Sequence, residues 1–144
     1  MPLISYKGNT DDINRKLMLK AFECMPSLIL DCGNTANPYL VSGFINEWQM
    51  HHVYVMNAEA IYRFRDALKE LPYWSDKLSV KCLVITTIHT LFSYDNPEEN
   101  YNVLLHCWEL MKNIAVEYPV YVGIANDQMH EEFAKRFSDE ILTI

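Results

Sequence analysis

The feature that most constrains this fold is the run at residues 80–85, Val-Lys-Cys-Leu-Val-Ile, in which five of six side chains are apolar. A strand that faces water on one side alternates apolar and polar residues, whereas a strand this apolar needs both of its faces covered. Parallel sheets provide that environment, because each crossover connection places a helix on the sheet. The run therefore predicts an α/β fold in which a mostly parallel sheet lies between two helical layers.

The rest of the chain repeats the same rhythm, with short apolar runs alternating with longer segments of helical period. The predicted strands are residues 3–6, 28–31, 52–56, 80–85, 120–124 and 141–144. The first predicted helix has Thr10 as its N-cap, and the second begins at Pro38. The third spans 58–71 and is followed by a loop at 72–77. The fourth runs from Pro97, capped by Asn96, to Tyr118, and the fifth spans 129–137. This alternation indicates βαβ units within a single domain that covers residues 1–144.

Composition excludes several classes of protein. No stretch approaches the ~20 consecutive apolar residues of a membrane span, and residues 1–8 lack the apolar centre of a secretory signal. We therefore expect a cytoplasmic protein with no membrane attachment. A net charge of −7 disfavours direct nucleic-acid binding, which needs a basic face.

The cysteines and histidines do not form a recognisable ligand pattern. Cys24, Cys32, Cys82 and Cys107 are widely spaced among apolar residues, so we expect buried, reduced thiols. His106 and Cys107 are adjacent, and on a helix their side chains point about 100° apart. The sequence therefore predicts no metal site.

Residues 82–92, Cys-Leu-Val-Ile-Thr-Thr-Ile-His-Thr-Leu-Phe, resemble the Walker B strand of RecA-type recombinases and KaiC-like ATPases. In that family, four apolar residues precede an acidic residue, a small hydroxyl residue and an apolar stretch that ends in Leu-Phe. The segments that fit the same family in the same order are 30–39, 53–71, 122–126 and 139–142. The resemblance implies a six-strand RecA-like sheet in the order 3-2-4-5-1-6, with right-handed crossovers.

The same resemblance places residues 6–16 on the phosphate-binding loop. A working loop, Gly-x-x-x-x-Gly-Lys-Ser/Thr, wraps the phosphates with backbone N–H groups and neutralises them with its lysine. Gly8 retains the first glycine, but Ile13, Asn14 and Arg15 stand at the Gly-Lys-Ser/Thr positions. Carboxylates at positions 11 and 12 would also repel an anion at the start of the helix.

Two further positions of the ATPase site are altered. Thr86 stands where the family keeps the aspartate that organises magnesium, and Gly33 and Asn34 stand where recombinases keep the water-activating glutamate. The resemblance therefore implies a pseudo-ATPase with no catalytic residues, metal or cofactor. The residues of this degenerate nucleotide site are Gly8, Asn9, Thr10, Asp11, Asn14, Arg15, Asp31, Asn34, Thr86 and Asn126.

The sequence leaves more than one function open. RecA-type ATPases act at subunit interfaces, so the resemblance implies a protein-interaction module, either an accessory paralogue of a recombinase or a homo-oligomer. A rival hypothesis is a small-ligand site, or an unconventional enzyme, in the groove beyond the carboxyl ends of the strands. A third, nucleic-acid binding, is disfavoured because the predicted loop at 93–99 is acidic and that at 126–128 is short.

Overall fold

The computed structural model describes residues 2–33, 46–91 and 97–144. Its strands are β1 (Leu3–Lys7), β2 (Ser27–Cys32), β3 (Val53–Ala58), β4 (Cys82–Ile85), β5 (Val120–Gly123) and β6 (Glu140–Thr143). Its helices are α1 (Thr10–Glu23), α2 (Glu47–Met50), α3 (Ile61–Lys77), the short 3-10 helix η2 (His89–Leu91), α4 (Pro97–Ile114) and α5 (Gln128–Phe137). All strand pairs are parallel, in the order β3-β2-β4-β5-β1-β6, so the predicted sheet order is confirmed.

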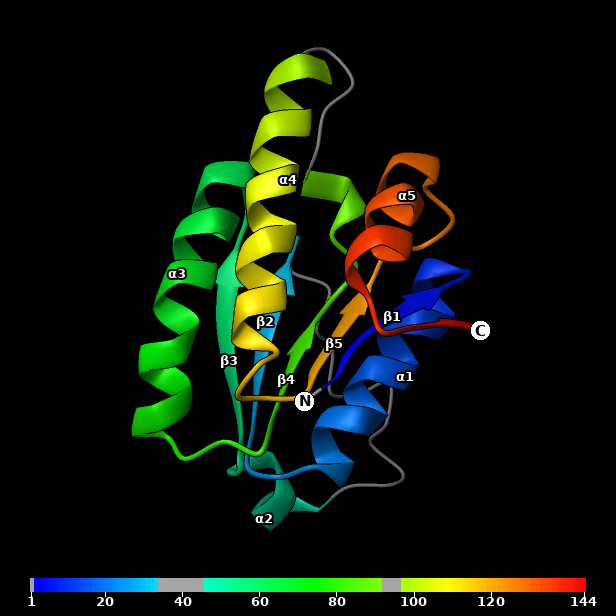
Figure 1. Ribbon diagram of the computed structural model, residues 1–144. Coiled ribbons are helices and arrows are strands. Elements are labelled where there is room, and N and C mark those ends of the chain that lie inside the picture. Colours follow the sequence, from blue (N-terminus) through cyan, green and yellow to red (C-terminus); the bar gives the residue numbers. More distant parts are fainter. Residues whose placement is uncertain (1, 34–45, 92–96) are drawn as a thin grey trace.

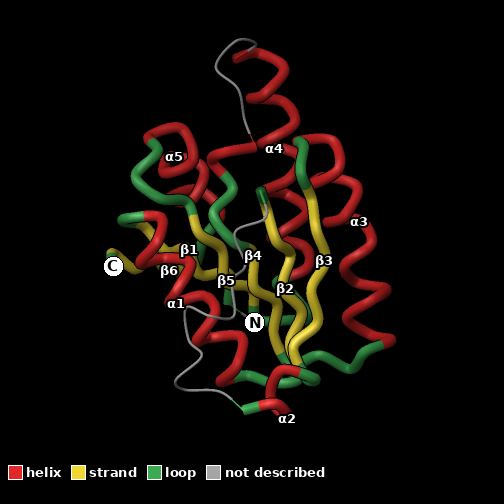
Figure 2. The backbone as a smooth tube through the Cα atoms, turned by 180° about the vertical axis from the view of Figure 1, so that it is seen from behind, coloured by secondary structure: helices red, strands yellow, loops and turns green. Residues whose placement is uncertain are grey.

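Helices cover both faces of this sheet. Figure 1 shows α3, α4 and α5 on one face, and Figure 2 shows α1 on the other. Leu28 and Leu30 of β2 pack into the cluster beneath the three helices, whereas Ile29 packs into the cluster beneath α1. This arrangement explains why β4 is apolar at every position, and it confirms the α/β/α architecture.

The structure corrects the prediction of a loop at residues 72–77. Helix α3 continues through Pro72 to Lys77 and ends with Leu78 as its C-cap. Proline removes a backbone donor and normally breaks a helix. Here, Leu71 and Ser75 on either side of it are buried, so packing against the sheet and α4 holds the helical path.

Several predicted helix boundaries differ from the structure. Residue 58 ends β3, so α3 begins at Ile61 rather than at 58. Helix α4 ends at Ile114 rather than at Tyr118, and α5 begins at Gln128 rather than at 129.

Asn9, rather than Thr10, caps α1, and Thr10 is the first helical residue. The helix expected from Pro38, and the cap expected at Asn96, fall at positions outside the described residues, although α4 does begin at Pro97. None of the described helices has the length and apolar character that a membrane span requires.

Candidate functional site

The junction between β1 and α1, where the resemblance places a phosphate-binding loop, consists of two residues, Gly8 and Asn9. The Gly8 N–H donates to the Ala125 carbonyl at 3.3 Å. Gly8 adopts φ +148°, and a side chain there would come within 2.7 Å of the carbonyl oxygen of Ile144. The chain therefore covers this junction with its own backbone.

The first turn of α1 is capped from within the chain. The Asn9 side-chain oxygen accepts from the N–H groups of Asp11 and Asp12 at 3.0 and 3.4 Å. Both aspartates are exposed in this first turn, so two carboxylates stand at the helix N-terminus, where an anion would otherwise bind.

Asn14, at the position of the expected lysine, faces inward. It is buried, and its side-chain oxygen accepts from the Thr87 N–H at 3.3 Å, which ties α1 to the chain after β4. Arg15 is exposed and lines a separate hollow of about 410 Å³ with Lys16 and Ile144. Asn14 and Arg15, although adjacent in sequence, are therefore not brought together at one site.

Thr86 and Asp31 join the carboxyl ends of β4 and β2. The Thr86 hydroxyl accepts from the Cys32 N–H at 2.7 Å and donates to the Asp31 carboxylate at 3.3 Å. Both side chains are buried. Where the resemblance expects an aspartate for magnesium, the structure thus has a neutral hydroxyl bonded to the neighbouring strand.

The remaining predicted positions lie apart from this bridge. Asn126 is exposed and directly precedes Asp127, the N-cap of α5, while Thr10 opens α1. Asn34 lies outside the described residues.

Sequence reasoning missed a buried histidine near the same end of the sheet. His130 in α5 is fully buried, and its backbone N–H donates to the Asp127 carboxylate at 3.2 Å. The pKa of His130 is lowered to about 4, chiefly by burial, with His89 adding to the shift and the Asp127 carboxylate opposing it. No local sequence pattern marks this histidine, because its burial depends on segments that meet only in the fold.

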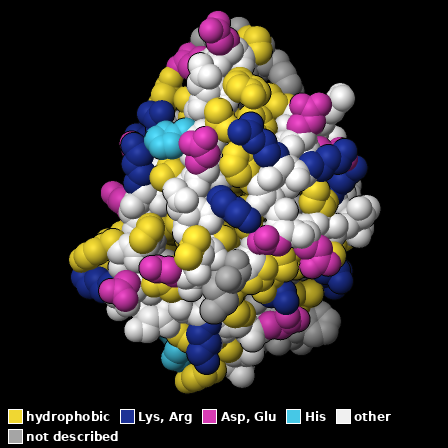
Figure 3. Space-filling model, in the orientation of Figure 1, with side chains coloured by type: hydrophobic (Ala, Val, Ile, Leu, Met, Phe, Trp, Pro, Cys, Tyr) yellow, Lys and Arg dark blue, Asp and Glu magenta, His cyan; other side chains and the backbone are white. Residues whose placement is uncertain are grey.

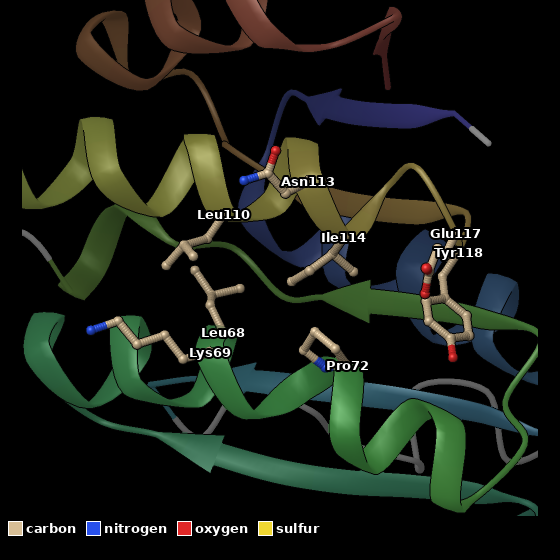
Figure 4. Close-up of a pocket in the computed structure, with 8 residues that line it drawn as sticks. All are labelled: Leu68, Lys69, Pro72, Leu110, Asn113, Ile114, Glu117 and Tyr118. Atoms are coloured by element: carbon tan, nitrogen blue, oxygen red, sulfur yellow. The ribbon is translucent and has the colours of Figure 1, made fainter.

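A further groove on the described surface lies between α3 and α4, and we call it the α3–α4 groove (Figure 4). It measures about 340 Å³ and is lined by the side chains of Leu68, Lys69, Pro72, Leu110, Asn113, Ile114, Glu117 and Tyr118. Figure 4 shows Lys69 toward one end of the groove and Glu117 toward the other. Neither charge has an ion pair within the part of the chain that the structure describes.

Charge over this face is mixed. Figure 3 shows basic and acidic side chains interspersed over the helical face, with no continuous basic patch in view. Among residues 2–33, 46–91 and 97–144, no group of three or more His, Cys, Asp or Glu could hold a metal ion.

No protein-family model matches this sequence, and no curated protein matches it significantly.

Proposed function

We propose that this chain is a non-catalytic RecA-like module, a pseudo-ATPase that works by associating with another protein chain. The observation that carries the proposal is the closed junction between β1 and α1. Its connection of two residues is too short to form the multi-residue cradle that a triphosphate needs.

Hydrogen bonding at this junction supports the absence of a phosphate site. Gly8 gives its N–H to Ala125, and Asn9 occupies the N–H groups of the first turn. A polyphosphate would have to displace these bonds and approach the carboxylates of Asp11 and Asp12. The lost hydrogen bonds and the charge repulsion both oppose the binding of a polyphosphate.

The bridge between Thr86 and Asp31 supports the absence of metal-assisted phosphoryl transfer. Thr86 carries no charge to organise magnesium, and Asp31 accepts the Thr86 hydroxyl in a buried position. The same burial disfavours the rival small-ligand or unconventional-enzyme hypothesis, because Asp31 and Thr86 are hydrogen-bonded to each other.

The α3–α4 groove supports a role in association. Its walls are mainly aliphatic, and its two ends carry charges of opposite sign, Lys69 and Glu117. An amphipathic segment of a partner would match it by placing apolar side chains on the floor, an acidic group at Lys69 and a basic group at Glu117. An accessory role beside a recombinase is the version of this function that the resemblance implies.

The proposal is tested by affinity capture from the native host, combined with light scattering of the purified chain. We expect either a stable oligomer or a co-purifying protein, and loss of that species when Lys69→Glu and Glu117→Lys are introduced together. The matched control reverses two exposed charges elsewhere, Lys81→Glu with Glu132→Lys, and should leave association intact. A strictly monomeric wild type that retains no partner would contradict the proposal.

A further inference from the structure

Two cysteines that are distant in sequence meet where α1 ends and β4 begins. The Cys82 thiol donates to the backbone carbonyl of Cys24 at 3.6 Å, across 58 positions of the chain. Both thiols are free. Cys82 is fully buried, whereas Cys24 is partly exposed, contrary to the expectation that all four cysteines are buried.

The backbone around this pair fixes the two positions relative to each other. The Lys81 N–H donates to the Pro26 carbonyl at 2.7 Å, and Ser27 of β2 lies opposite Cys82 of β4 in the parallel register. The Ser27 hydroxyl donates to the Ala21 carbonyl at 2.7 Å, which folds the end of α1 against the start of the sheet. The proximity of Cys24 and Cys82 is thus built into the α1–β2–β4 contact.

Exposure distinguishes the two thiols, since Cys24 is partly exposed and Cys82 is fully buried. Burial raises the pKa of the Cys82 thiol, a hydrogen bond with the Cys24 side chain raises it further, and the Lys20 ammonium opposes these effects. Lys20 also lies 5.1 Å from the centre of the Tyr121 ring, which keeps its charge beside the pair. A solute reaches the partly exposed Cys24 first, and the buried Cys82 thiol lies against the Cys24 backbone carbonyl.

We infer that Cys24 and Cys82 are a peroxide-sensitive thiol pair, in which Cys24 is oxidised and Cys82 resolves it as an intramolecular disulfide. The Cys24 thiolate attacks one peroxide oxygen, the O–O bond breaks, and water leaves after proton uptake, which gives a sulfenic acid. The Cys82 thiol then loses its proton and its sulfur attacks the Cys24 sulfur. The S–O bond breaks, and the leaving hydroxide takes up the proton and departs as a second water. Two thiols thereby lose two electrons and two protons to hydrogen peroxide.

The test treats the folded full-length chain with hydrogen peroxide, blocks remaining thiols by alkylation, and analyses the protein by mass spectrometry. We expect an intact mass lower by about 2 Da before alkylation and a Cys24–Cys82 cross-linked peptide that dithiothreitol removes. The oxidised chain should also melt several degrees higher, because the link constrains the unfolded state.

Single variants separate the roles of the thiols. Cys82→Ser should stop the reaction at a Cys24 sulfenic acid that dimedone traps, and Cys24→Ser should prevent the cross-link and leave Cys82 reduced. Cys32→Ser is the matched control, since Cys32 is fully buried, and it should leave the cross-link unchanged. Oxidation of wild-type Cys24 to sulfinic acid without a cross-link, or a link that joins two molecules, would overturn the inference.

Discussion

The β1–α1 junction and the α3–α4 groove differ in whether their polar groups are bonded within the chain. At the junction, Gly8 donates to Ala125, and Asn14 accepts from Thr87. In the groove, Lys69 and Glu117 have no ion pair among the described residues, although aliphatic side chains lie between them.

This difference separates a surface that stabilises the fold from one that is available to a partner. Polar groups bonded within the chain resist a ligand, because a ligand must first replace their bonds. Solvated charges beside an apolar floor lose little on contact with complementary groups and provide specificity. We therefore expect the junction to stabilise the fold, and we propose the groove as the surface for recognition.

The largest effect we predict is a loss of stability in acid at the closed end of the molecule. The pKa of His130 is about 4 in the folded chain and 6.5 in the reference state, so only the unfolded chain takes up this proton between those values. The free energy of unfolding should fall as the pH is lowered from 6.5 to 4, by about 3 kcal/mol from this group. Urea unfolding at several pH values measures the loss.

Carboxylates also titrate in part of this range, so the comparison uses His130→Gln. The pKa values of Glu131 and Asp139 are lowered, chiefly by hydrogen bonds from Lys7 and the Leu3 N–H respectively, and both groups remain in the variant. The difference in pH slope between wild type and variant isolates His130. Equal slopes would contradict the buried, neutral histidine.

Next in size is Gly8→Ala, which tests the closure of the junction. Gly8 has a φ that side chains rarely adopt, and an added Cβ would lie 2.7 Å from the Ile144 carbonyl oxygen. We expect a loss of roughly 2–3 kcal/mol in the free energy of unfolding. The control is Gly33→Ala at φ +74°, for which we expect about 1 kcal/mol, and equal losses would show that the contact with Ile144 has no effect.

A smaller loss is expected for Asn14→Ala. The variant leaves the buried Thr87 N–H without its acceptor and should lower the free energy of unfolding by about 1–2 kcal/mol. Asn102→Ala, at an exposed position in α4, should change it by less than about 0.5 kcal/mol. If Asn102→Ala lowered the free energy of unfolding as much as Asn14→Ala, the hydrogen bond between Asn14 and Thr87 would not be the cause of the loss.

The smallest stability effect is predicted in the groove. Reversing Lys69 and Glu117 together should change the free energy of unfolding by less than about 0.5 kcal/mol, because both side chains are exposed. Denaturant unfolding of the purified variant measures this. A loss of several kcal/mol in the free energy of unfolding would show that the groove charges stabilise the fold, which would contradict a role limited to partner recognition.

Sequence pattern predicted the sheet and most of the helices, since these follow from local periodicity. The apolar run at 80–85 required cover on both faces, and Pro97 with its acidic followers marked the start of α4. The prediction failed at Pro72, because a local helix breaker was overridden by the packing of its buried neighbours, Leu71 and Ser75.

The contacts of the candidate site were less predictable, since they join segments far apart in sequence. The bond between Asn14 and Thr87 spans 73 positions, and that between Thr86 and Asp31 spans 55. The resemblance suggested which residues stand at the expected lysine and aspartate positions, but the hydrogen-bond partners of these residues depend on the register between strands. The burial of His130 and the meeting of Cys24 with Cys82 likewise arise only from the tertiary fold.

The central claim is that the closed junction between β1 and α1 does not bind nucleotide. Isothermal titration of the wild-type chain with ATP and magnesium tests it most directly. We predict no heat beyond dilution at millimolar nucleotide, and no rise in melting temperature under the same conditions. Saturable one-to-one binding with a micromolar Kd would contradict the account.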